Sequence, residues 1–509
     1  MPEGAPVNRA LITVSVMLAT IMQALDMTIA NVALPHMQGS MSATQDQISW
    51  VLTSYIVAAA IMTPPTGWLA ARYGRKRLFV VTVTGFTLVS MLCGAATSLD
   101  EMVLFRLLQG AFGAGLVPLS QAVLLDSFPR EQHGRAMAMW GVGVMVGPIL
   151  GPTLGGWLTE YYNWRWVFYI NLPFGILALL GILAFVPETR RDSSRPFDFF
   201  GFALLSLSIG ALQLMLDRGE TKDWFSSTEI IAEAVIMALC FYLFLVHMFT
   251  ARRPFIEPAL FKDRNFATGL LFIFFVGIIL LATLSLLPPF LQGLMGYPVL
   301  TTGYLLAPRG VGTMCAMFMV GFLTGRLDVR LLILIGLGLT ALSLWQMAGF
   351  TAEVSSFAIV ESGVIQGLGL GFMFVPLSTI AFATLAPERR TEATAMFSLM
   401  RNIGSSIGIS VVVSLLAQNT QINHAALAEQ ATPFNPIFQQ PNIAHYWGLN
   451  SQAGLAALNV EITRQAATIA YVDDFRLMMY LMLLAIPMLL LLRSPRRQRA
   501  ATAALAHAE

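Results

Sequence analysis

Long apolar runs dominate this sequence, and short polar stretches interrupt them at nearly regular intervals. A helix that crosses a bilayer needs about 20 consecutive, mostly apolar residues. Fourteen runs are long enough; they cover about 11–34, 48–70, 77–98, 102–125, 136–158, 166–187, 199–216, 228–249, 266–288, 300–323, 329–349, 357–382, 396–417 and 472–492. The pattern predicts an all-α integral membrane protein with 14 transmembrane helices.

The composition strengthens this prediction and excludes several function classes. Hydrophobic residues make up 56% of the 509 residues and charged residues 11%, whereas soluble domains carry about 25% charged residues. The first apolar run is too long for the core of a cleavable signal peptide. The three cysteines match no metal or redox spacing, and no GxxxxGK[ST] motif for ATP occurs. We expect no metal, no cofactor, no nucleic acid and no enzymatic activity.

Basic residues predict the orientation of the helices. Lys and Arg gather in every second loop, at 72–77, 130–135, 190–195, 252–264, 326–330, 389–390 and in the tail at 493–499. Short loops rich in Lys and Arg stay in the cytoplasm. The alternation therefore predicts that both termini are cytoplasmic.

The chain also contains an internal repeat. QGAFGAGLVPLS at 109–120 recurs as QGLGLGFMFVPLS at 366–378, and each copy is followed by a basic loop and a glycine-bearing helix. Parallel repeats of this kind place a binding site between them near mid-membrane. We expect six helices in 1–195, an extra helix pair in 196–263, and six helices in 264–509, with a long extracytoplasmic loop at about 418–471. That loop is interpreted as a hairpin that meets a partner or as a solvated spacer.

Asp26 lies inside the first apolar run, where a charge is costly unless it faces the bundle interior. Gln23 lies on the same helix face, three residues earlier. Ionisable residues within membranes are mostly functional, so we favour proton or substrate handling over a hydrogen bond that only holds helices together.

Arg106 opens the fourth apolar run. A rise of about 1.5 Å per residue places it at a depth near that of Asp26, and Gln109 shares its face. An ion pair between Asp26 and Arg106 across the central cavity is geometrically possible. An arginine that snorkels to the interface is the alternative.

A stretch of small residues, GVMVGPILGPTLGG, fills 143–156. Glycines four residues apart line one helix face and admit a second backbone, and each proline removes a helix hydrogen bond. Plain helix packing is the alternative to a functional face. The residues concerned are Gly143, Gly147, Pro148, Gly151, Pro152, Gly155 and Gly156.

These stretches resemble motifs of the major facilitator superfamily, and in particular its 14-helix drug:proton antiporters of the EmrB type. The 143–156 stretch resembles motif C of the antiporters, and RLLQG at 106–110 resembles motif B. LDMTIANVALP at 25–35 resembles the first-helix signature, which includes Asp26 and Asn31. RNIG resembles a thirteenth-helix motif through Arg401, Asn402 and Gly404.

GWLAARYGRKRL at 67–78 resembles motif A, the cytoplasmic link between the second and third helices. The resemblance assigns Gly67, Gly74, Arg75 and Lys76 to a gate loop. Ala71 stands where the motif usually has aspartate, and this departure weakens the case for the charge-relay gate of the superfamily. A plain positive-inside loop explains most of these basic residues.

The resemblance implies a proton-coupled exporter of hydrophobic toxic compounds in a bacterial inner membrane. It also implies an EmrA-like periplasmic adaptor and a TolC-like outer-membrane channel as partners. Two alternatives remain open: an exporter of one metabolite or lipid, and a membrane sensor or scaffold that transports nothing.

Overall fold

The computed structural model describes residues 8–189, 191, 196–324, 326–432, 434–436, 440, 447 and 451–492. Within them, 12 helices are long and apolar enough to cross a membrane, and two bent helix pairs raise the number to as many as 14. The predicted all-α membrane fold is therefore confirmed. The basic tail at 493–499 lies outside the described residues.

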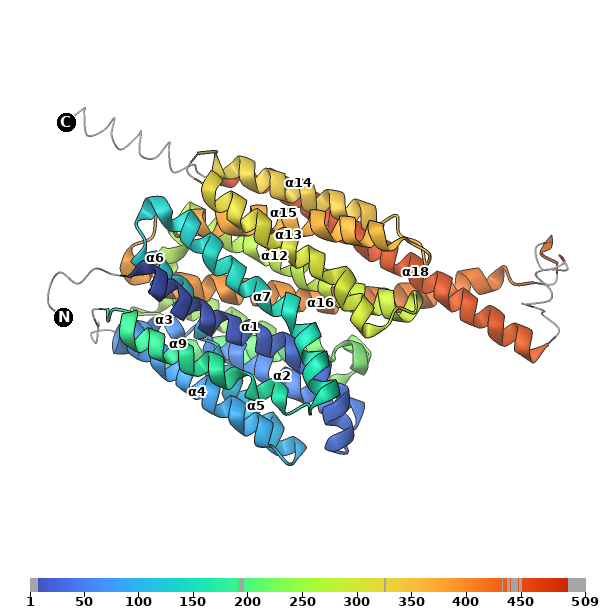
Figure 1. Ribbon diagram of the computed structural model, residues 1–509, viewed down its shortest axis with the longest axis horizontal. Coiled ribbons are helices and arrows are strands. Elements are labelled where there is room, and N and C mark those ends of the chain that lie inside the picture. The colour runs from blue at the N-terminus through green and yellow to red at the C-terminus, as the bar shows by residue number, and fades with distance from the viewer. Residues whose placement is uncertain are drawn as a thin grey trace.

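The helices follow the predicted runs closely (Figure 1). The first part of the chain contains α1 (Arg9–Ser40), α2 (Gln45–Met62), α3 (Thr66–Tyr73), α4 (Arg75–Ala95), α5 (Leu99–Gly113), α6 (Leu116–Ser127), α7 (His133–Tyr161), α8 (Trp166–Tyr169) and α9 (Asn171–Phe185). Then come α10 (Phe199–Arg218) and α11 (Thr228–Thr250). The rest contains α12 (Arg264–Pro289), α13 (Val299–Leu323), α14 (Val329–Met347), α15 (Ser356–Phe382), α16 (Arg390–Glu429) and α18 (Gln452–Ala485).

Proline accounts for one of the bent pairs. Pro64 and Pro65 separate α2 from α3, and the two helices meet at 55°. Proline lacks the N–H that a continuous helix needs and clashes with the preceding turn. The α2–α3 pair thus crosses as one broken span.

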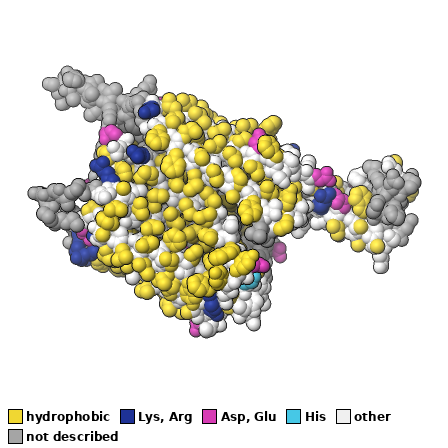
Figure 2. All heavy atoms as spheres, in the orientation of Figure 1, with side chains coloured by type: hydrophobic (Ala, Val, Ile, Leu, Met, Phe, Trp, Pro, Cys, Tyr) yellow, Lys and Arg dark blue, Asp and Glu magenta, His cyan; other side chains and the backbone are white. Residues whose placement is uncertain are grey.

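The outer surface of the bundle is apolar over most of the face in Figure 2, while Lys and Arg side chains gather mainly at one end. That end, here called the basic side, holds the start of α1 and the 72–77 loop. Arg264 there donates to the carbonyl of Leu491 at 2.7 Å, so the end of the described chain lies on the same side. An apolar belt with a basic rim is the surface that a bilayer requires.

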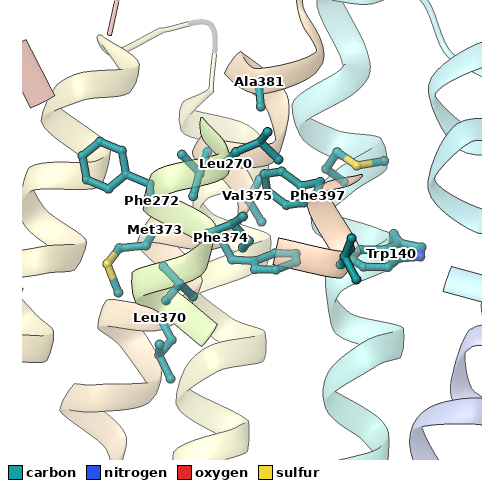
Figure 3. Packing of buried hydrophobic residues seen from close by; sticks show 14 of the residues in the cluster. Trp140, Leu270, Phe272, Leu370, Met373, Phe374, Val375, Ala381 and Phe397 are labelled. Atoms are coloured by element: carbon teal, nitrogen blue, oxygen red, sulfur yellow. The ribbon is translucent and has the colours of Figure 1, made fainter. Parts of the chain in front are cut away.

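Two bundles meet along α7, which packs against both α13 and α15. Trp140 of α7 stacks on Phe374 of α15 with ring centroids 5.7 Å apart (Figure 3). At the basic side, Thr394 of α16 donates to the carbonyl of Pro118 at 3.0 Å. The halves of the chain are therefore in direct contact at this end.

α10 packs against α2 and α16, and α11 packs against α10. Ser410 of α16 donates to the carbonyl of Leu216 at 2.9 Å, and Trp224 donates from its ring nitrogen to Ser414 at 2.8 Å. α11 leaves most of its side chains exposed on the outside of the bundle. α10 and the turn that follows it thus contact elements from both halves.

The segment predicted as a long loop at about 418–471 is helical over much of its length. α16 continues to Glu429, and α18 begins at Gln452, capped by the Ser451 hydroxyl, which accepts from the N–H of Gly454 at 3.0 Å. Alanine, leucine and glutamate favour helix here. The two helices extend together beyond the bundle (Figure 1) as a hairpin, and His424 lies 3.0 Å from Asn459 across it.

Candidate functional site

The centre of the candidate site is an ion pair between α1 and α5. Arg106 Nη1 donates to Asp26 Oδ2 at 2.8 Å, and both side chains are 1% exposed. Gln109 ties the two ions together, because its Oε1 accepts from Arg106 at 2.7 Å and its Nε2 donates to Asp26 Oδ1 at 2.9 Å. One turn of α5 therefore contacts the carboxylate through both Arg106 and Gln109.

Three further elements complete this network. Asn171 of α9 donates from Nδ2 to Asp26 Oδ1 at 2.8 Å and to Ser90 of α4 at 2.9 Å. Arg106 Nε donates to the carbonyl of Val51 of α2 at 3.0 Å, and its guanidinium lies 4.3 Å from the ring centroid of Tyr55. A cation over an aromatic face is stabilised by the ring quadrupole.

The network makes Asp26 and Arg106 depend on each other. Removing one partner of a buried ion pair typically costs about 3–5 kcal/mol because the other charge is left uncompensated. Protonation of Asp26 would have the same consequence without a mutation, since a neutral carboxyl no longer balances Arg106. A buried pair whose acid is protonated in one conformation and paired in another is what coupling a proton to a conformational step requires.

The location of the Asp26–Arg106 ion pair differs from the one considered from the sequence. Asp26 and Arg106 do meet, but inside the first bundle rather than across a cavity between the halves. Gln23 is buried one turn away, and its Oε1 accepts no hydrogen bond from the described residues. Asn31 is exposed further along α1. The structure thus brings Gln109 to the pair and leaves Asn31 apart from it.

Asn171, Ser90 and Tyr55 were not identified from the sequence. Asn171 lies in the WRWVFYINLPFG stretch at 164–175, where a lone amide within an apolar run was an available signal. Tyr55 and Ser90 gave no comparable signal, because hydroxyl groups are common in membrane helices and can bond to their own backbone.

The small-residue face of α7 packs on α1. A Cβ added at Gly147 would lie 2.6 Å from Cβ of Ala24, and one at Gly155 would lie 3.3 Å from the carbonyl oxygen of Ile29. Thr28 donates to the carbonyl of Gly147 at 3.0 Å. The close approach expected of this face is present, and it holds α7 against the helix that carries Asp26. Gly156 differs, because a Cβ there would meet no atom within 4 Å.

Two other glycines of the stretch at 143–156 also face α1. An added Cβ at Gly143 would lie 3.3 Å from Met17, and one at Gly151 would meet the side chain of Thr28. Pro148 is half-buried. The side chain of Pro152 lies outside the described residues.

The predicted gate loop takes part in an ion cluster at the basic side. Arg75 pairs with Asp126 of α6, and Arg390 of α16 donates to the same carboxylate at 2.6 Å. Lys76 donates to the carbonyl of Leu183 at 2.7 Å. Arg75 is therefore more than a solvated positive-inside residue, because Asp126 joins it to a cation from the second half.

The two glycines of this loop have separate roles. A Cβ at Gly67 would lie 2.7 Å from Cα of Glu392 in α16, so glycine lets the halves approach. Gly74 adopts a φ of +91°, which L side chains rarely take,.

In the second half, Gly404 packs on α12, and a Cβ there would lie 3.0 Å from the carbonyl carbon of Phe274. Arg401 and Asn402 are half-buried on the preceding turn. Neither contacts the Asp26 network. Among the described residues, no group of three or more His, Cys, Asp or Glu side chains is arranged to hold a metal ion.

Many secondary transporters are helical membrane bundles built from parallel repeats, with substrate and coupling-ion sites near the bilayer midplane. Residues 16–409 match the Major Facilitator Superfamily. The chain belongs to this superfamily.

Curated relatives match almost the whole chain. The multidrug export protein EmrB of Escherichia coli (strain K12) is 36% identical over 477 residues, which cover 93% of each chain. EmrB of Haemophilus influenzae is 35% identical over 470 residues, 91% of this chain and 92% of that protein. The fatty acid resistance protein FarB of Neisseria gonorrhoeae is 34% identical over 489 residues, 96% of each.

A solved structure shows the same fold at low sequence identity. The human organic anion transporter MFSD10 has a TM-score of 0.60 at 16% identity and covers 94% of this chain and 100% of its own. This likeness shows the fold, while the superfamily match and the curated relatives confirm the predicted family; the chain is similar throughout to proteins of the EmrB type.

Proposed function

We propose that this protein is a proton-coupled exporter of hydrophobic toxic compounds across a bacterial inner membrane. It works by alternating access and exchanges inward proton flow for outward substrate movement. The names of the EmrB relatives support multidrug export. FarB keeps a second candidate open, a narrow exporter of a lipid.

The buried Asp26–Arg106 pair carries this proposal. A carboxylate in the membrane interior is costly unless it is paired or neutral. In the paired state Arg106, Gln109 and Asn171 all bind the charged carboxylate. In the protonated state Arg106 loses its counterion and favours another arrangement of α1 and α5. Proton arrival thus changes the relative free energy of two conformations.

The glycine face of α7 supplies the mechanical connection. α7 contacts α1 on one side and α13 of the second half on the other. A rearrangement around Asp26 therefore reaches the interface between the halves through a single helix. In this proposal residues 1–195 and 264–509 are the rocking bundles and 196–263 is the added pair.

We place the basic side in the cytoplasm, with both termini there. The Arg75–Asp126–Arg390 cluster then closes the cytoplasmic end, and its separation accompanies opening to the cytoplasm. The hairpin of α16 and α18 extends from the opposite side, where a periplasmic adaptor joined to an outer-membrane channel would meet it.

The decisive experiment uses purified full-length protein in vesicles with an imposed pH gradient. We expect efflux of several chemically unrelated dyes, and we expect Asp26→Asn to abolish it. Asp223→Asn is the matched control, because Asp223 is exposed and its left-handed φ of +53° suits asparagine,. Transport of one lipid alone would support the narrow exporter, and absence of all transport would support a sensor or scaffold.

A further inference from the structure

A cleft lies between α2 of the first half, the added helix α10, and α16 of the second half. It is separate from the Asp26 network, which lies on the other side of α2. Apolar side chains line most of it, from Ile56, Val57, Leu216, Ile409 and Val413. Such a surface suits a hydrophobic ligand, since apolar walls with few polar groups are typical of small-molecule sites.

Two of the polar residues that line the cleft are acidic. Asp217 of α10 lines it and is exposed, and Thr53 of α2 donates a hydrogen bond to its carboxylate. Glu220, one turn further on, accepts from the ring nitrogen of Trp224 at 3.2 Å. No ion pair engages either carboxylate among the described residues. The neighbouring cation, Arg218, pairs instead with Glu229.

A buried amide also lines the cleft without a partner. Gln213 lies one turn before Asp217 on the same face of α10 and is 3% exposed. Its Nε2 atom has no hydrogen-bond partner within the described part of the chain. Buried polar groups are normally satisfied. The unsatisfied amide can bind a polar atom of a ligand that occupies the space beside Asp217.

We propose that this cleft binds lipophilic organic cations, with Asp217 as the counter-charge and the apolar walls as the hydrophobic surface. The inference rests on the proposed export function and names a substrate class for it. It also assigns a function to α10, because the cleft-lining residues from α2 and α16 are uncharged and α10 supplies the carboxylate of Asp217.

The position of the cleft links binding to the proton site. Val51 and Tyr55 lie one turn apart on α2 and contact Arg106. Thr53 lies between them in sequence, and a rotation of about 100° per residue turns it to the opposite side of the helix. α2 therefore carries the proton network on one face and the hydroxyl that binds Asp217 on the other. A cation that displaces this hydroxyl acts on the helix that holds Arg106.

The test is equilibrium binding to the purified full-length protein without a pH gradient. The charged probe is tetraphenylphosphonium, and the neutral probe of similar shape is triphenylphosphine oxide. We expect Asp217→Asn to weaken tetraphenylphosphonium binding about fivefold, as for a partly screened charge pair. Triphenylphosphine oxide binding should not change, and Asp217→Glu should preserve binding of both probes.

Two further variants distinguish loss of the cleft from a general loss of folding. Ile409→Trp fills the cleft from α16 and should weaken binding of both probes, while Asp223→Asn should change neither. Unchanged tetraphenylphosphonium binding in Asp217→Asn, or equal loss of both probes, would overturn the proposal. Because binding needs no proton gradient, failure of export alone would count against the proposed function and leave the cleft assignment standing.

Discussion

Each half of the chain has a buried glutamine followed by a glycine at a helix contact, but the group that the glutamine binds differs between the halves. In the first half, Gln109 donates to the carboxylate of Asp26 at 2.9 Å. The repeat places Gln366 at the matching point of the second half, where it donates to the hydroxyl of Thr283 at 3.2 Å. The hydrogen bond is retained, and the acid is replaced by a neutral group.

The glycine after each glutamine shows that the two glutamine sites occupy corresponding positions in the two halves. An added Cβ at Gly110 would lie 3.0 Å from the carbonyl carbon of Tyr55, and one at Gly367 would lie 3.0 Å from that of Arg309. Arg309 therefore stands where the first half has an aromatic ring. Its Nη2 donates to the carbonyl of Leu280 at 3.2 Å, but its buried Nη1 has no partner among the described residues.

The two halves therefore share their helix packing but differ in their buried charged groups. Helix packing at the glycines is common to both halves, so it belongs to the fold. The matched acid–base pair occurs in the first half, so proton coupling is expected there, while the buried cation of the second half, Arg309, has no ion-pair partner in the described part of the chain. The predictions below test this asymmetry.

The largest effect is expected from the acid itself. Asp26→Asn should eliminate the protons released when substrate binds to detergent-solubilised protein, because the group that exchanges them is gone. Thr283→Val should leave proton release intact and weaken binding by no more than about tenfold, the value of one neutral hydrogen bond. A pH-indicator dye measures both. Normal proton release by Asp26→Asn would place coupling elsewhere.

The next effect concerns helix approach, which both halves share. Gly147→Leu should abolish transport while the protein remains in the membrane, because the added side chain collides with Ala24. Gly408→Leu should do the same, since a Cβ there would lie 2.7 Å from Cα of Ile278. Gly156→Leu is the control and should transport normally. Transport by Gly147→Leu at the level of this control would contradict a tight α1–α7 contact.

Substitution of Arg106 and substitution of Arg309 should have different effects on the stability of the protein. Arg106→Met strands Asp26 and should lower the free energy of unfolding by about 3–5 kcal/mol. Arg309→Met removes a buried charge that forms no ion pair with the described residues, so it should leave stability unchanged or increase it. Thermal unfolding in detergent compares them. In Asp26→Asn/Arg106→Met the losses should be less than additive, and strict additivity would mean that the pair does not interact.

The smallest effect is expected at the two glutamines. Gln109→Met leaves the Asp26–Arg106 ion pair in place and removes hydrogen bonds to charged groups, which should cost about 1.5–3 kcal/mol, whereas Gln366→Met removes one neutral bond worth about 0.5–1.5 kcal/mol. The first should therefore destabilise the protein more. Equal unfolding temperatures for the two variants would argue that the Gln109 and Gln366 sites are chemically equivalent.

The sequence predicted what depends on position along a helix. Apolar run lengths gave the helices, and the rise per residue placed Asp26 and Arg106 at one depth. It did not predict which helices enclose them, because Asn171, Tyr55 and Ser90 reach the site through packing between distant segments. The cleft beside Asp217 depends on where α10 docks, and periodicity carries no information about docking. The Arg75–Asp126–Arg390 cluster likewise joins residues from separate halves.

The length of α16 has a mechanical consequence. Its 40 residues run without a break from Arg390, in the basic-side cluster, to Glu429 in the hairpin. At about 1.5 Å per residue the helix is roughly 60 Å long. Each degree of tilt about the Arg390 end therefore moves the far end by about 1 Å. Tilting of α16 at the Asp126 cluster would therefore be amplified at Glu429, where the helix ends in the hairpin.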